Sequence, residues 1–126
     1  MTARQTLAAY EQHINKQDFN LLLDLIDADA TFWFSDGTHR GVGAIRAAFE
    51  RTWALMGPDE RYWLTDKTWI AECDDAAACT YTFNWRVGDN SGSGRGTTVL
   101  ARTSAGWRIV HEHLSRIPRP SAPSSP

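Results

Sequence analysis

Two histidines and a glutamate alternate near the end of the chain, as His111, Glu112 and His113. On a β-strand, side chains two positions apart share a face, so the two imidazoles would lie together, as a pair of metal ligands must. No third ligand with convincing spacing accompanies them. We therefore expect no metal here, and prefer a structural role or a place in a dimer interface for both histidines. Glu112 would point to the opposite face.

Other reactive side chains lie in a polar connection or in apolar runs. Asp36, His39 and Arg40 fall in one short connection, which predicts either a polar lip beside a cavity or a solvated turn. The two cysteines, Cys73 and Cys79, lack metal-ligand spacing. We expect both to be buried, reduced thiols.

The elements that position these residues begin with helices. Apolar residues recur at helical spacing in residues 7–14, 21–26 and 43–56, which predicts three helices. The β-branched and aromatic run at residues 30–34 predicts a first strand before the third helix. Gly57, followed by proline, ends the helical part of the chain.

The rest of the chain has the pattern of a sheet. Alternating apolar residues predict four long antiparallel strands, over residues 62–73, 78–87, 97–103 and 107–117. The glycine-rich segment 88–94 is interpreted as a flexible connection. Helices and strands in this order favour an α+β fold, with the helices on one face of a curved sheet.

Length and charge limit the possible functions. The chain has 126 residues and a net charge of −2, which favours one domain and argues against a nucleic-acid partner. No apolar run approaches the roughly 20 residues that a membrane span needs, so we expect a cytoplasmic protein with no membrane partner. The domain is predicted to cover residues 1–117, and the proline-rich segment 118–126 to be a disordered tail.

Three segments resemble known proteins. Residues 27–31, 41–47 and 106–115 are similar to SnoaL-like and ketosteroid-isomerase-like domains of the nuclear-transport-factor-two-like superfamily. The last segment also resembles the closing strand of the calcium/calmodulin-dependent kinase association domain. This resemblance covers nearly the whole chain to Ile117. It implies a cystatin-like α+β barrel, in which a cone-shaped antiparallel sheet wraps around three helices from the first half of the chain.

The resemblance identifies positions where relatives carry out chemistry. Tyr10 matches the tyrosine that stabilises an oxyanion in ketosteroid isomerases, but Phe34 and Thr98 stand where those enzymes have acidic residues. Phenylalanine cannot abstract a proton, so this mechanism is disfavoured. Ligand-binding arginines of the kinase domain match Phe83, Thr98 and Leu114, so that mode of anion binding is unsupported.

The same match implies which side chains face a pocket. Glu112 and Tyr10 are the catalytic candidates, because a carboxyl group in apolar surroundings gains a raised pKa that suits acid–base chemistry. A register one residue out would instead turn Glu112 to the opposite face. Arg102 would either meet Glu112 or a ligand, or lie solvated at the mouth. The ligand-binding candidates are Phe32, Phe34, Trp53, Tyr81, Phe83, Trp85, Thr98, Leu100, Arg102 and Leu114.

Three functions are compatible with this pocket. The first is a protein that binds, and in the enzymatic case converts, a small, largely apolar or aromatic molecule without a cofactor. The second is a non-catalytic association module, and the third a hydratase or epoxide hydrolase, which needs a carboxylate to activate water. The many aromatic residues indicate either core packing alone or a homodimer through the outer sheet face, with Trp69, His111 and His113 at the interface. The family resemblance favours the dimer.

Overall fold

The fold is an α+β layer structure, as predicted, in a computed structural model that describes residues 1–117. The segment 118–126, with its tail prediction, lies outside the described residues. The elements follow in the order α1 (Ala3–Ile14), a 3-10 helix η1 (Phe19–Leu22), β1 (Ile26–Phe34), β2 (Gly37–Arg40), α2 (Gly41–Met56), β3 (Arg61–Glu72), β4 (Ala76–Val87), β5 (Asn90–Thr103) and β6 (Gly106–Arg116).

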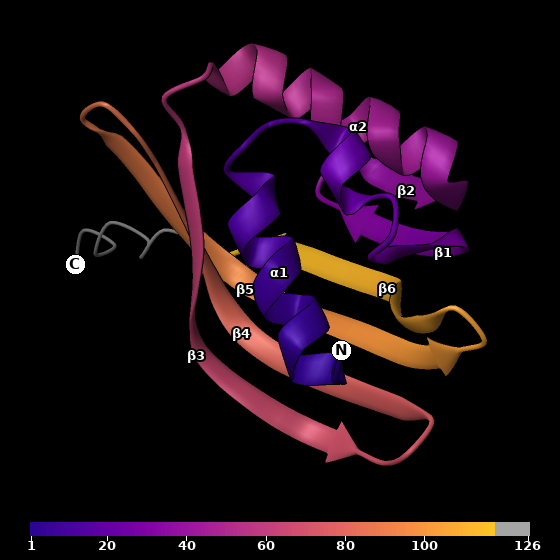
Figure 1. The fold of residues 1–126 in the computed structure, drawn as a ribbon. Helices are drawn as coiled ribbons and strands as arrows, with labels where there is room; N and C mark the ends of the chain where they lie inside the picture. Colours follow the sequence, from indigo (N-terminus) through magenta and orange to yellow (C-terminus); the bar gives the residue numbers. More distant parts are fainter. Residues whose placement is uncertain (118–126) are drawn as a thin grey trace.

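The six strands form one sheet in the order β2-β1-β6-β5-β4-β3. All neighbours are antiparallel except β1 and β6, which run parallel. The sheet is curved and does not close into a barrel, and both helices lie on its concave side (Figure 1). There α1 packs on β3, β5 and β6, and α2 packs on β1 and β2. A pocket can therefore form between the helices and the sheet.

Helix α1 presents one apolar stripe to the sheet. Thr2 caps its first turn, because its hydroxyl accepts a hydrogen bond from the backbone of Gln5 while the Gln5 side chain accepts one from the backbone of Thr2. Leu7, Tyr10 and Ile14 follow at helical spacing and are buried. The cap and the stripe together fix the depth at which Tyr10 enters the core.

The second predicted helix was wrong. Residues 19–22 form a single 3-10 turn capped by Asp18, and Ile26 already belongs to β1. The backbone N–H of Ile109 donates to the carbonyl oxygen of Leu25 at 2.7 Å. Pairing with the last strand thus takes this apolar segment into the sheet, a tertiary effect that overrides its helical spacing.

Strand β5 begins at Asn90, so the prediction of a flexible connection over 88–94 was also wrong. Only Gly88 and Asp89 form the turn, and Gly88 has a positive φ of 57°. The glycines that follow alternate along one face of β5, each opposite an aromatic residue of β4; the pairs are Gly92 with Trp85, Gly94 with Phe83, and Gly96 with Tyr81.

These three glycines have a packing role. A Cβ at Gly92 would lie 2.6 Å from the Trp85 ring nitrogen, and one at Gly94 or Gly96 would overlap the opposing ring and a neighbouring atom of β6. The aromatic side chains therefore lie over bare backbone of the next strand. The absence of side chains at these three positions of β5 allows the rings of β4 to turn inward over the sheet.

The outer sheet face differs in part from expectation. Trp33, 46% exposed, lies between His111 and His113, with ring centroids 4.8 and 5.5 Å apart. The prediction that Trp69 lies on the outer face was wrong. Trp69 packs against the core, with the Arg4 guanidinium 5.3 Å from its ring centroid. Its side of β3 is the side that α1 covers, which is why it is not available on the outer face.

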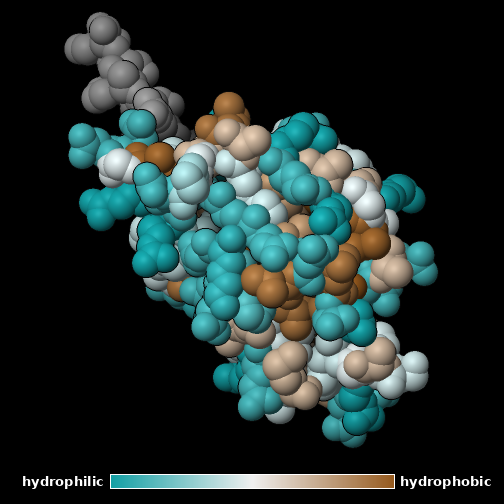
Figure 2. All heavy atoms as spheres, turned by 45° about the horizontal axis from the view of Figure 1, so that its top comes forward, coloured by the Kyte–Doolittle hydropathy of each residue, from teal (hydrophilic) through white to brown (hydrophobic). Residues whose placement is uncertain are grey.

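Other surface features complete the fold. Cys79 is buried, but Cys73 is exposed at the end of β3, contrary to expectation, because its strand ends in a solvent-facing turn. Hydrophobic side chains in Figure 2 gather near the middle of the face and are surrounded by hydrophilic ones. Within residues 1–117, no helix is long and apolar enough to cross a membrane.

Candidate functional site

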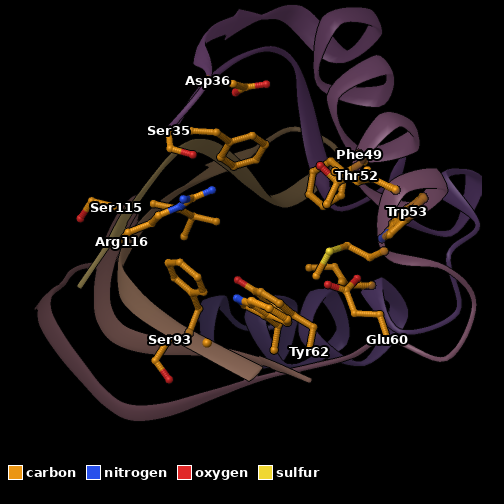
Figure 3. A pocket seen from close by; sticks show the side chains of 18 of the residues that line it. Ser35, Asp36, Phe49, Thr52, Trp53, Glu60, Tyr62, Ser93, Ser115 and Arg116 are labelled. Carbon is orange, nitrogen blue, oxygen red and sulfur yellow. The ribbon is translucent and has the colours of Figure 1, made fainter. Parts of the chain in front are cut away.

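A cavity of about 960 Å³ opens between helices α1 and α2, the starts of β3 and β5, and the ends of β4 and β6. This volume is in the range of small-molecule sites. Figure 3 shows labelled side chains of α2, β3, β5 and β6 around it. The wall is mainly aromatic, and Tyr62 and Phe83 stack at 6.1 Å with an angle of 18° between their planes. The aromatic lining residues are Tyr10, Phe34, Phe49, Trp53, Tyr62, Phe83 and Trp85.

Glu112 lies at the floor of this cavity and is 1% exposed. It pairs with Thr98 on β5 and with Phe32 on β1, which places its side chain on the concave face. His111 and His113 consequently lie on the outer face, where His111 Nδ1 is 2.6 Å from the carbonyl oxygen of Thr31. The register of β6 thus aims the carboxyl group into the cavity.

Three hydroxyl groups surround the Glu112 carboxyl. Tyr10 donates to Oε2 at 3.0 Å, and Tyr81 and Thr98 lie 3.2 and 3.3 Å from Oε1. The Tyr81 and Thr98 hydroxyls are also 2.7 Å from each other. Two hydroxyl protons cannot fill the three contacts among Tyr81, Thr98 and Oε1. A proton on Oε1 would fill the third, so the arrangement accommodates neutral Glu112.

The protonation of this cluster is tuned by burial. Desolvation raises the pKa of Glu112 to about 7, although the hydrogen bonds from Tyr10, Tyr81 and Thr98 act in the opposite direction. Burial and the neighbouring Glu112 raise the pKa of Tyr10 well above its usual value, so Tyr10 stays a donor. A carboxyl group with this pKa can give or take a proton near neutral pH.

Most of the predicted pocket residues lie at the cavity or directly behind it. Tyr81 and Thr98 are buried behind Glu112 and hold its carboxyl group, while Phe32 and Leu100 are fully buried in the core. The predicted residues that line the cavity are Tyr10, Phe34, Trp53, Phe83, Trp85, Glu112 and Leu114.

Arg102 does not belong to this site. It is exposed near the turn between β5 and β6 and pairs with Asp75 at 3.4 Å. The residues of β5 that line the cavity are Ser91, Gly92 and Ser93. Arg102 lies roughly 30 Å from them along the strand, at about 3.3 Å per residue. Arg102 follows the same alternation as the inward-facing Thr98 and Leu100, but it lies outside the cavity because β5 extends far beyond it.

Two further carboxyl groups line the cavity, and Glu60 was missed entirely. It lies between α2 and β3, is 8% exposed, and burial raises its pKa. Within residues 1–117, its carboxyl group makes no hydrogen bond or ion pair. Exposed Asp59 precedes it, and nothing in the local sequence distinguishes the two.

The second is Asp36, at the edge beside Phe34. His39 Nε2 lies 2.9 Å from Asp36 Oδ1, and this contact lowers the pKa of Asp36. His39 is 9% exposed and packs on Phe34, so it is no solvated turn residue. Arg40 is exposed and lies outside the lining. Of these three residues, Asp36 lines the cavity, and His39 pairs with it from strand β2, which the sequence pattern did not reveal.

Comparisons with known proteins agree on the family and the fold. The family model for the SnoaL-like domain matches residues 3–120, as the resemblance predicted. A nuclear transport factor 2 (NTF2-like) superfamily protein from Salmonella enterica serovar Typhimurium has a similar structure, with 21% identity, a TM-score of 0.79, and coverage of 96% of this chain and 92% of that one.

Two other solved structures are similar. An NTF2-like protein of unknown function from Pseudomonas putida KT2440 has 21% identity and a TM-score of 0.78, over 89% of this chain and 82% of its own. The association domain of C. elegans CaMKII has 19% identity and a TM-score of 0.72, over 89% and 90%. No curated protein matches the sequence. At these identities the structures show the fold alone.

Proposed function

The chain belongs to the SnoaL-like domain family, and we propose that it binds a small, largely apolar or aromatic molecule and transfers a proton on it through Glu112. The observation that carries this proposal is the position of Glu112: a buried carboxyl group with a pKa of about 7 at the floor of an aromatic cavity. An acid–base group is most effective when its pKa is close to the working pH.

The surroundings of Glu112 support a positioned proton carrier. Tyr10, Tyr81 and Thr98 come from three different elements and hold both carboxyl oxygens. A group held in this way loses little freedom when it reacts. Phe34 lines the same cavity at the position of the isomerase base, so proton transfer from β1, as in ketosteroid isomerases, stays disfavoured.

The stacked wall supports a flat ligand. Tyr62 and Phe83 are nearly parallel, and Trp53 and Trp85 also line the cavity. Aromatic rings bind planar apolar molecules through offset or edge-on contacts. A bound ring between this wall and α2 would bring one edge toward the floor, where Glu112 lies.

The test uses small phenols and aromatic ketones that carry an acidic C–H. Binding is followed by the fluorescence of the tryptophans, two of which line the cavity, and proton transfer by solvent deuterium exchange into the ligand. Glu112→Gln should keep binding and lose exchange, because the amide keeps the shape without the titrating proton. The control is Glu50→Gln on the exposed side of α2. Exchange that persists in Glu112→Gln would refute the role of Glu112.

A specific observation also favours association of two copies. Trp33 is exposed between His111 and His113 in the middle strands of the outer sheet face. We propose that this face forms a homodimer interface, since an exposed tryptophan set in partly apolar surroundings gains most by burial against a partner. The similar structure of a domain named for association supports this proposal.

A further inference from the structure

Glu60 is the carboxyl group lining the cavity that has no hydrogen-bonded or ionic partner among residues 1–117. Asp36 is paired with His39 and lies 3.6 Å from Arg51, and Glu112 is held by three hydroxyl groups. Glu60, by contrast, is 8% exposed, and its carboxyl group has no hydrogen bond or ion pair among residues 1–117. Glu60 lines the cavity, so an occupant of opposite charge would offset the charge of its carboxylate.

The aromatic neighbours of Glu60 favour the same kind of occupant. Figure 3 shows the Glu60 side chain on the same side of the cavity as Trp53 and Tyr62, which also line it. The faces of such rings attract cations, most strongly where water is excluded. An anionic ligand group would meet repulsion from Glu60 at this place.

The balance of charge around the cavity agrees. Within residues 1–117, its lining includes three acidic residues, Asp36, Glu60 and Glu112, against a single basic one, Arg116. Arg116 is exposed at the end of β6, and Figure 3 shows it across the cavity from Glu60. The wall near Glu60 is therefore negative and aromatic.

We propose that the ligand carries an ammonium or protonated amine group, which Glu60 binds with Trp53 and Tyr62 beside it. This inference rests on the proposed function, because it assigns the charge of the molecule that the cavity binds. The apolar or aromatic part of the ligand lies along the stacked wall, and its cationic group lies at the Glu60 side.

The experiment compares two probes of the same shape. One is (4-hydroxybenzyl)trimethylammonium, which is permanently charged, and the other is 4-neopentylphenol, in which carbon replaces the nitrogen. Their affinities are measured by tryptophan fluorescence with the wild-type chain, with Glu60→Gln, and with Asp59→Asn as the control. The ammonium probe should bind the wild type about tenfold more tightly, a modest value for a desolvated cation beside aromatic rings and a carboxylate.

Glu60→Gln should remove this preference while 4-neopentylphenol binds as before, and Asp59→Asn should retain it. Thermal unfolding of both variants verifies that they fold. Equal affinity of the two probes for the wild type, or a preference that survives in Glu60→Gln, would overturn the role of Glu60 and leave the proposed aromatic site intact. Failure of both probes to bind would overturn the aromatic site as well.

Discussion

Replacement of Glu112 by Gln is expected to change how the stability of the protein depends on pH. In the wild type, the pKa of Glu112 rises from 4.5 to about 7 on folding. Between these values the folded protein holds a proton that the unfolded chain has lost, so the free energy of unfolding falls as pH increases through this window. The Glu112→Gln variant has no such proton.

The magnitude follows from the two pKa values. At 1.36 kcal/mol for each pH unit, a rise from 4.5 to about 7 corresponds to ~3 kcal/mol. The variant should therefore gain about 3 kcal/mol relative to the wild type between pH 4.5 and pH 8, whatever its stability at the lower pH. The raised pKa of Glu60 gives a slope of the same sign, but both proteins share it and it cancels in the difference.

The assay is urea unfolding of the wild type, Glu112→Gln and the surface control Glu50→Gln at steps from pH 4.5 to 8. The wild type and the control should lose stability together, and Glu112→Gln should lose much less. Parallel curves for the wild type and Glu112→Gln would show that Glu112 does not titrate in this window. They would refute both the burial argument and the acid–base role.

Three other changes test packing, association and the hydrogen bonds of the carboxyl cluster. Gly94→Ala should lower the free energy of unfolding in urea by about 2–3 kcal/mol, because the new methyl group overlaps Phe83 and the backbone of Ser115. Gly43→Ala adds a methyl group in open space on α2 and should stabilise by up to about 1 kcal/mol. Equal effects of the two changes would contradict the packing role. Trp33→Glu should shift sedimentation from a dimer to a 14.1 kDa monomer, and a wild type that is already monomeric at micromolar concentration would rule out the dimer. Tyr10→Phe should raise the pKa of Glu112 further, because it removes a hydrogen bond that lowers it; a lower pKa, measured by carboxyl NMR titration, would contradict the proposed donor.

Regular periodicity made most of the fold predictable. The stripe of Ile45, Phe49 and Trp53 and the stop at Gly57 predicted α2 closely. The alternation in β4 predicted which of its residues share a face, and the family resemblance indicated that this face is the inward one. The failures lie where long-range contacts decide. Leu25 and Ile26 have helical spacing but pair with the last strand, and the glycines of β5 resemble a loop until the rings opposite them are known.

The candidate site was predictable only in part. Tyr10 and Glu112 came from a family resemblance, and only the three-dimensional register of β6 shows that they meet at 3.0 Å. Glu60 carries no sequence signal, because its burial results from the closing of α2 and β3 around the cavity mouth. Its chain neighbour Asp59 is exposed, so local composition could not separate them.

The place of β6 in the sheet has a consequence for how the protein is made. It is the last strand in sequence, yet it lies between β1 and β5 and alone joins β1 and β2 to the rest of the sheet. During synthesis, the facing edges of β1 and β5 therefore stay unpaired until β6 leaves the ribosome, and such edges favour aggregation. Glu112 arrives with that same strand. A nascent chain thus gains its continuous sheet and Glu112 in one step, which depends on contacts between strands far apart in the sequence and should be slow.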